Sequence, residues 1–295
     1  MPESHRGPRQ AQFSDHMVEG RCLRVARFGN EAVAPGRPLL FFSGIGANIE
    51  LLAPFLESLK GREVMTFDMP GLGGSAPGSG PYRLSAMADI GARILKELGV
   101  GKADVMGVSW GGMLAQEFAY RHPQIVNRLV LAATTAGFPL IPGSPSSLVK
   151  MVTSQRYANP GAIDDYLHAL YGGRTSGLEG YATRIRPPSS SGYLHQLLAI
   201  AGWTSVRKLT RVRARTLVLM GAEDRLVPPA NGQILKFLLS DADLRVLADA
   251  GHLFVLTHRD EVAARIEAFL DRPLMQTASG ATAGPSIRGP AQGVA

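Results

Sequence analysis

A serine, an aspartate and a histidine lie far apart in this 295-residue chain, in the types and order that nucleophilic catalysis needs. Ser109 stands at the centre of Gly107-Val108-Ser109-Trp110-Gly111, which fits the pattern G-x-S-x-G. A serine hydroxyl is a weak nucleophile at neutral pH and needs an adjacent base that a carboxylate orients. Asp224 and His252 follow Ser109 in the chain. The sequence therefore predicts Ser109 as nucleophile, Asp224 as orienting acid and His252 as general base.

The residues around Ser109 predict a strand, a sharp corner and a helix in direct succession. Asp104 to Val108 is a short run typical of a buried strand, and a helical pattern begins directly after the serine. Glycine at 107 and 111 removes side chains that would collide where the strand and the helix cross. The corner would project the hydroxyl above the sheet, with the free N–H groups of the helix behind it. The alternative is an ordinary serine at a helix N-cap.

The acid and the base are expected on loops that follow two further strands. Asp224 comes after a predicted strand at residues 215–220, and His252 comes after another at 244–247. The carboxyl ends of parallel strands meet at one edge of a sheet, so these loops can reach Ser109. Two alternatives remain open. Asp224 is also a common residue type for a turn, and His258, at the start of the last predicted helix, is a second candidate base.

Two backbone N–H groups are predicted to hold the oxyanion of a tetrahedral intermediate. Trp110, directly after the nucleophile, supplies one of them. Ile45, in the loop after a predicted strand at 39–42, supplies the other, because Gly44 and Gly46 let the backbone approach. This loop also resembles the start of a dinucleotide-binding fingerprint, but isoleucine stands at the third glycine position, so cofactor binding is disfavoured.

The serine mechanism requires no cofactor and no metal. Cys22 is the only cysteine, which excludes an intramolecular disulfide and a cysteine-based zinc site.

Short apolar runs alternate with helical patterns along most of the chain, which predicts an α/β fold with a mostly parallel central sheet and helices on both faces. The alternation breaks in one long segment rich in Pro, Gly and Ser, which is too long for a loop and is predicted to be a helical lid inserted after the sixth strand. The expected organisation is a core at 17–136 and 207–272, a lid at 137–206, and disordered tails at 1–16 and 273–295.

Composition and charge limit the classes of function. An apolar content of 45% and a charged content of 19% are typical of a soluble globular protein. No apolar run approaches the roughly 18 residues of a membrane span, and no secretory signal is visible, so a cytoplasmic location is expected. Residues 138–215 hold ten Lys and Arg against three acidic residues, the whole net charge of +7. This segment is either a solvated face or a surface for an anionic partner; no nucleic-acid-binding motif accompanies it.

With these residues assembled, the chain resembles the α/β-hydrolases and, within them, the intracellular medium-chain-length poly(3-hydroxyalkanoate) depolymerases. The resemblance implies hydrolysis of ester bonds in a stored polyester to 3-hydroxy acids or oligomers, the same three catalytic roles, and association with the polyester granule. Where many hydrolases of the superfamily carry His-Gly before the oxyanion residue, this chain has Ser43-Gly44. The matching segments are FFSGIGANIELLAPF, FDMPGLGGS, GVSWGGMLAQEFA, LVLAATTAG, LYGG, GYLHQLLAIAGWTS, TLVLMGAEDRLVP and AGHLF.

The predicted lid offers apolar residues for an aliphatic side arm of the substrate. Tyr171, Leu198 and Trp203 are the candidate substrate-binding residues, although such residues also form the packed core of a lid. A small-molecule carboxylesterase, lactonase or C–C bond hydrolase of the same fold is the alternative function. The sequence leaves the oligomeric state open.

Overall fold

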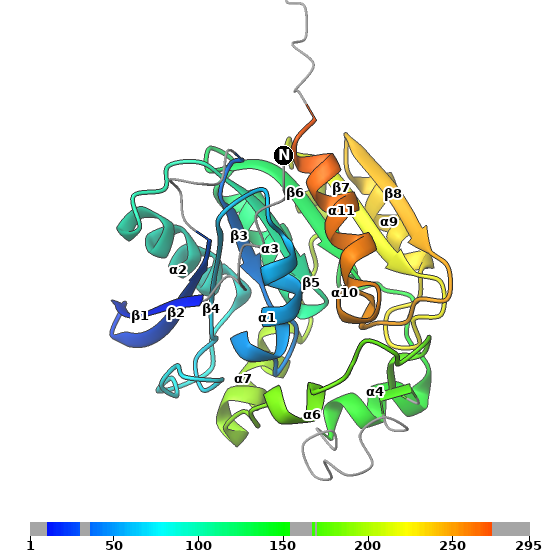
Figure 1. Ribbon diagram of the computed structural model, residues 1–295, viewed down its shortest axis with the longest axis horizontal. Coiled ribbons are helices and arrows are strands. Elements are labelled where there is room, and N and C mark those ends of the chain that lie inside the picture. The colour runs from blue at the N-terminus through cyan, green and yellow to red at the C-terminus, as the bar shows by residue number, and fades with distance from the viewer. Residues whose placement is uncertain (1–10, 30–35, 154–166, 169, 273–295) are drawn as a thin grey trace, which may run out of the picture.

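A computed structural model describes residues 11–29, 36–153, 167–168 and 170–272. Its centre is an eight-stranded sheet with the strand order β1-β2-β4-β3-β5-β6-β7-β8 (Figure 1). The strands are β1 (Ala11–Val18), β2 (Arg21–Phe28), β3 (Leu39–Phe42), β4 (Val64–Phe67), β5 (Ala103–Val108), β6 (Val126–Ala132), β7 (Arg215–Gly221) and β8 (Ala242–Leu247).

The sheet is antiparallel at one side and parallel elsewhere. β2 pairs antiparallel with β1 and β4, whereas every pair from β4 through β8 is parallel. The central strands read as continuous apolar runs because both of their faces are covered, and all residues of β3, β4 and β5 are buried. The parallel direction brings the carboxyl ends of β3, β5, β7 and β8 to one edge of the sheet.

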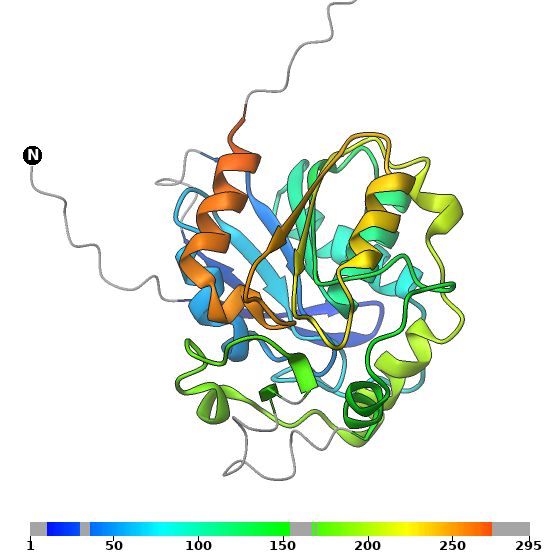
Figure 2. The same cartoon turned by 90° about the vertical axis from the view of Figure 1, so that its right-hand side faces the viewer.

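Helices cover both faces of the sheet. Figure 2 shows the sheet between these two layers of helices. Side chains of a strand alternate between its faces, so successive residues of β5 enter different cores. Val105 packs with α2 and α3 on one side, and Met106 packs with α1 and α11 on the other. The helices of these two layers are α1 (Ile49–Ser58), α2 (Leu84–Glu97), α3 (Trp110–Arg121), α9 (Ala230–Leu238), α10 (Phe254–Thr257) and α11 (Arg259–Leu270).

The N-terminal strand corrects the boundary of the predicted tail at residues 1–16. β1 begins at Ala11 and pairs with β2 along its whole length, from Ala11 opposite Phe28 to Val18 opposite Arg21. A tight turn with positive φ at both Glu19 and Gly20 joins the two strands. The remainder of that predicted tail, residues 1–10, and the predicted tail at 273–295 lie outside the described residues.

Between β6 and β7 the chain leaves the sheet and forms short helices: α4 (Pro145–Val152), α6 (Tyr181–Arg184), α7 (Ser190–Ile200) and α8 (Val206–Leu209). Figures 1 and 2 show α4, α6 and α7 beneath one end of the sheet, apart from the two helical layers. This is the segment for which the sequence predicts a lid, and its function as a lid stays a prediction. None of the helices in the described part of the chain has the length and apolar character needed to cross a membrane.

Candidate active site

Ser109 occupies a strained corner between β5 and α3. Its backbone has φ 57° and ψ −118°, a conformation that residues with a Cβ rarely adopt. The crossing is tight because a Cβ at Gly107 would overlap the backbone of Gly111, and a Cβ at Gly111 would overlap the carbonyl oxygens of Phe42 and Ser43. These two glycines therefore allow the corner, as the G-x-S-x-G spacing predicts.

The structure brings Ser109, His252 and Asp224 together at the carboxyl edge of the sheet. The Oγ atom of Ser109 lies 2.9 Å from Nε2 of His252, and Nδ1 of His252 lies 2.8 Å from Oδ2 of Asp224. Asp224 and His252 are buried, and Ser109 is partly accessible. With Nδ1 donating to the carboxylate, Nε2 is left as the acceptor for the serine hydroxyl. This arrangement can activate an alcohol as a nucleophile.

The orienting carboxylate is itself fixed by its loop. The N–H groups of Leu226 and Val227 donate to Oδ1 of Asp224 at 2.9 and 2.8 Å, which leaves Oδ2 for the imidazole. The Asp224 carboxylate therefore closes a local turn as well as holding His252. The turn and the contact with His252 are thus compatible in one residue, and the role of Asp224 as orienting acid stays a prediction.

Tyr171 packs against one face of the His252 imidazole. Its ring is stacked on that of His252, with centroids 5.5 Å apart and an angle of 11° between the planes. Its carbonyl accepts the N–H of His252 at 2.9 Å. Tyr171 therefore helps to fix the imidazole, a role that the sequence pattern gave no means to predict because it depends on a lid residue reaching the core.

The alternatives of Ser109 as a helix cap and of His258 as the base receive no support from the contacts. The Ser109 side chain makes no capping hydrogen bond to α3. His258 is buried at the N-terminus of α11, where its Nδ1 lies 2.9 Å from Oγ1 of Thr257. Burial and the nearby Arg174 cation lower the pKa of His258. His252, and not His258, lies beside the serine.

The loop after β3 lies next to the serine, as expected for the second oxyanion donor. Ile45 and Gly44 line the same cavity as Ser109 and His252, and Trp110 is the first residue of α3. The first N–H groups of a helix have no intrahelical acceptor, which suits Trp110 for the predicted role. The assignment of Ile45 and Trp110 as oxyanion donors remains a prediction.

The buried side chain of Asp68 connects the end of the loop after β3 to the loop after β4. Asp68 accepts the N–H of Ile49, at the start of α1, and the N–H of Gly74, each at 2.9 Å. It is 1% exposed, and burial raises its pKa to about 6 despite these hydrogen bonds and the nearby Arg24 cation. Sequence reasoning missed Asp68, because its role depends on how the loop after β4 packs against the start of α1.

The cavity beside Ser109 is small and mostly apolar, with a volume of about 50 Å³. Of the three candidate substrate-binding residues, only Tyr171 is among its lining residues. The Trp203 indole instead donates to Oε2 of Glu117 at 3.0 Å, and Leu198 is 47% exposed on α7. Helices α1 and α10, the loop after β7 and the lid contribute the remaining apolar wall, which includes Leu51, Leu52, Tyr181, Leu226, Val255 and Leu256.

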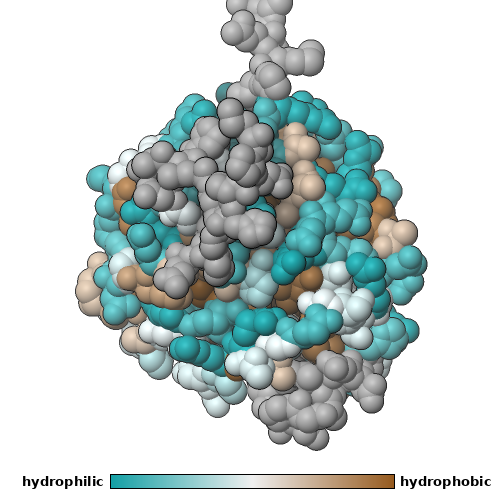
Figure 3. Space-filling view, in the orientation of Figure 1, coloured by the Kyte–Doolittle hydropathy of each residue, from teal (hydrophilic) through white to brown (hydrophobic). Residues whose placement is uncertain are grey.

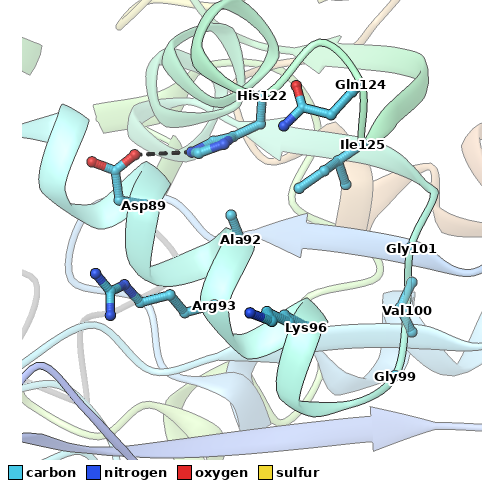
Figure 4. A pocket seen from close by; sticks show the side chains of 10 residues that line it. All are labelled: Asp89, Ala92, Arg93, Lys96, Gly99, Val100, Gly101, His122, Gln124 and Ile125. Atoms are coloured by element: carbon cyan, nitrogen blue, oxygen red, sulfur yellow. Dashed lines mark hydrogen bonds and ion pairs between the residues drawn. The ribbon is translucent and has the colours of Figure 1, made fainter.

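A larger cavity, of about 670 Å³, lies at the opposite end of the sheet from Ser109 (Figure 4). It is lined by α2 and by the segments that precede β5 and β6, and includes His122, which pairs with Asp89 at 2.9 Å. It contains no residue of the predicted catalytic set. In the described residues, no group of three His, Cys, Asp or Glu side chains is placed to hold a metal ion.

Comparison with known proteins agrees with this geometry. The family described as the alpha/beta hydrolase fold matches residues 37–259. A poly(3-hydroxyalkanoate) depolymerase of Ectopseudomonas oleovorans is 42% identical over 269 residues, which cover 87% of this chain and 95% of that protein. A 2-hydroxymuconate semialdehyde hydrolase of Pseudomonas putida is 30% identical, over 72% of this chain and 78% of its own.

The solved structures support the same fold. The enol-lactonase from Burkholderia xenovorans LB400 has a TM-score of 0.74 and 22% identity, over 88% of this chain and 100% of its own. The eight-stranded sheet with helices on both faces is the architecture that the sequence predicts. The chain therefore belongs to the α/β-hydrolase family and is an ester hydrolase.

Proposed function

We propose that this protein cleaves the ester bonds of medium-chain-length poly(3-hydroxyalkanoate) through an acyl-enzyme on Ser109. The observation that carries the proposal is the hydrogen-bonded series Ser109–His252–Asp224 beside an apolar cavity. The choice of a polyester over other esters rests on the 42% identity to a poly(3-hydroxyalkanoate) depolymerase over 269 residues, which extends beyond the core into the lid.

The first half of the reaction acylates the serine. Nε2 of His252 accepts the proton of the Ser109 hydroxyl as Oγ attacks the ester carbonyl carbon. The negative charge that develops on the carbonyl oxygen is held by the N–H groups of Trp110 and Ile45. Asp224 stabilises the imidazolium that forms and holds its tautomer.

The second half releases the product and restores the serine. His252 donates its proton to the leaving hydroxyl of the next monomer, and the ester bond to that monomer breaks. A water molecule then loses a proton to His252 and attacks the carbonyl carbon of the acyl-enzyme. His252 returns this proton to Oγ of Ser109 as the bond between Oγ and the acyl group breaks, which releases a 3-hydroxy acid or an oligomer.

The size of the cavity sets a condition on the substrate. A volume of about 50 Å³ accommodates only about three to five groups of the size of water, at roughly 10–15 Å³ each. A side arm of several methylene groups therefore extends past the cavity and displaces lining residues of the lid, such as Tyr181. Activity on medium-chain substrates would thus depend on how readily the lid lining moves.

We place contact with the polyester granule on the lid. Several large apolar side chains of the lid segment are more than a third exposed, among them Phe138 at 71%, Val149 at 60% and Leu194 at 52%. Figure 3 shows apolar residues among hydrophilic ones on the face where Figure 1 places α4, α6 and α7. The basic residues of the same segment would add attraction to an anionic coat, and salt would screen this attraction.

A sedimentation assay with granules tests this placement. Replacing Val149 by Asp should reduce the fraction of protein that sediments with the granules, and added salt should reduce it further. If neither change reduces this fraction, the lid is not the surface that contacts the granule.

A small-molecule ester or C–C bond hydrolase is the second candidate. It is favoured by the small cavity and by the 30% identity to a 2-hydroxymuconate semialdehyde hydrolase. A C–C bond hydrolase would use the same base and oxyanion donors on a ketone instead of an ester.

Product analysis on isolated medium-chain polyester tests the proposal. The wild type should release 3-hydroxy acids or short oligomers, and Ser109→Ala should release none above background. The same two proteins are then compared on short p-nitrophenyl esters and on a vinylogous 1,5-diketone. Rapid turnover of either small substrate with no release from the polyester would replace the first candidate with the second.

A further inference from the structure

One lid residue, Gln196 on α7, contacts both segments that carry the predicted oxyanion donors. Its side-chain Oε1 accepts the N–H of Gly46 at 2.7 Å, and its backbone carbonyl accepts the indole N–H of Trp110 at 2.9 Å. Gly46 directly follows Ile45, and Trp110 directly follows Ser109. The two halves of the oxyanion site are thus joined through a single residue that belongs to neither.

The burial of Gln196 points to a positional role and not to a gain in folding stability. Its side chain is fully buried, and Nε2 has no acceptor among the described residues. A buried donor without an acceptor costs at least as much as a typical intramolecular hydrogen bond contributes. The bond to Gly46 is therefore offset, at least in part, by the buried Nε2 donor.

A second lid contact reaches the same loop. Asn48 is fully buried and lies two residues after Gly46. Its Nδ2 donates to the carbonyl of Arg184 at 3.1 Å, and its Oδ1 accepts the N–H of Arg186 at 3.1 Å. The loop that carries Ile45 is therefore attached to the lid through Gly46 and through Asn48.

We propose that Gln196 is a positioning residue that couples the placement of α7 to the geometry of the oxyanion hole. The inference rests on the proposed serine mechanism, in which donors must be fixed before charge develops on the carbonyl oxygen. A lid that substrate displaces would shift Gln196 and with it the loop at Gly46.

The test compares wild type with Gln196→Met, which keeps the volume and removes the acceptor. We expect kcat on a p-nitrophenyl ester to fall by roughly 10- to 100-fold, less than the ~10²–10³ lost when a donor itself is removed. KM should change by less than about threefold, since ground-state contacts are kept.

Binding of two inhibitors separates this role from general loosening of the fold. A trifluoromethyl ketone forms a hemiketal with Ser109 and places an oxyanion in the hole, so its affinity should fall by the same factor as kcat/KM. The corresponding ether cannot form the oxyanion and should bind with unchanged affinity. Wild-type affinity of Gln196→Met for the trifluoromethyl ketone would overturn the proposal.

Two further variants complete the design. Tyr193→Phe, on the same helix, removes the bond from the tyrosine hydroxyl to the carbonyl of Met151 at 2.6 Å and should retain wild-type kcat. Trp110→Phe removes the other contact of Gln196 and should lower kcat in the same direction, which keeps the test available if Gln196→Met does not fold. A loss in Tyr193→Phe as large as in Gln196→Met would assign the effect to the lid as a whole and refute the specific role.

The proposed function can fail separately. If wild type neither hydrolyses esters nor reacts with the trifluoromethyl ketone, and Ser109→Ala behaves identically, the serine mechanism is wrong. If wild type does both and Gln196→Met matches it, only the role of Gln196 is wrong.

Discussion

Replacing Ser109 by glycine should abolish activity and make the protein more stable than the alanine variant. Both substitutions remove the hydroxyl that lies 2.9 Å from His252, so the loss of this hydrogen bond cancels in the comparison. What differs is the backbone, because Ser109 has φ 57° and ψ −118°. Alanine keeps the Cβ that makes this conformation unfavourable, and glycine removes it.

The expected difference follows from two opposing effects. A residue with a Cβ in a sparsely populated backbone region costs about 1–3 kcal/mol. Glycine gives the unfolded chain more freedom, which lowers stability by roughly 0.4–1 kcal/mol. The free energy of unfolding of Ser109→Gly should therefore exceed that of Ser109→Ala by about 1.3 kcal/mol at the middle of these ranges, and by up to roughly 2.5 kcal/mol.

Urea unfolding of the two variants, followed by circular dichroism, measures this difference. The matched control is Ala264→Gly at an exposed position of α11, where the same loss of a Cβ should cost about 1 kcal/mol. If glycine in place of alanine raises the free energy of unfolding at position 109 and lowers it at position 264, the stabilisation comes from the backbone conformation at the corner. If Ser109→Gly is no more stable than Ser109→Ala, the corner stores no strain and the argument fails.

Three further predictions concern the surroundings of the site. Asp68 has a folded-state pKa of about 6, above its unfolded value of 3.8, so the folded protein holds the proton more tightly and ionisation between these values weakens folding. The free energy of unfolding of wild type relative to that of Asp68→Asn should therefore fall by up to about 3 kcal/mol as pH rises from 4 to 6 and stay constant above that. A difference between the urea midpoints of the two proteins that stays the same across this pH range would contradict the prediction. Arg62→Met should cost about 3–5 kcal/mol in the same assay, because Asp104 is then left buried without its guanidinium at 2.9 Å; a cost below about 1 kcal/mol would show that the pair is replaceable. Gly111→Ala should cost about 3 kcal/mol, since the new Cβ meets the rigid carbonyl oxygen of Phe42, and an unchanged thermal midpoint would contradict the tight crossing.

Much of the fold could be predicted because its signals are local. The strands expected at 39–42 and 104–108 are β3 and β5, and a buried parallel strand is visible in sequence as a short apolar run. The N-terminal hairpin was missed for the opposite reason. β1 is an edge strand whose residues are mostly exposed, so its polar sequence resembles that of a tail.

The meeting of Ser109, Asp224 and His252 could be predicted because chain order and strand ends restrict where these residues lie. A carboxylate and a histidine that each follow a parallel strand must lie at the same edge as the serine, and the structure brings all three within hydrogen-bonding distance. Their roles remain predictions that activity measurements must test.

The lid contacts could not be predicted, because they depend on how separate segments pack. Trp203 and Leu198 were as apolar in sequence as Tyr171, but only Tyr171 reaches the cavity. Gln196 and Asn48 carry no local signal, since each acts through backbone groups more than 130 residues away in the chain.

The buried guanidinium of Arg62 bears on how the nascent chain becomes active. It pairs with Asp104 at the start of β5 and with Asp271 directly after α11, so it connects the strand that leads to Ser109 with the last described helix. Domains emerge from the ribosome amino end first, and the arginine and the reactive serine are synthesised long before their partners at 252 and 271. A ribosome-bound intermediate thus lacks His252 and the second of these two carboxylates around Arg62, which delays both final packing and ester cleavage until synthesis of this helix is complete.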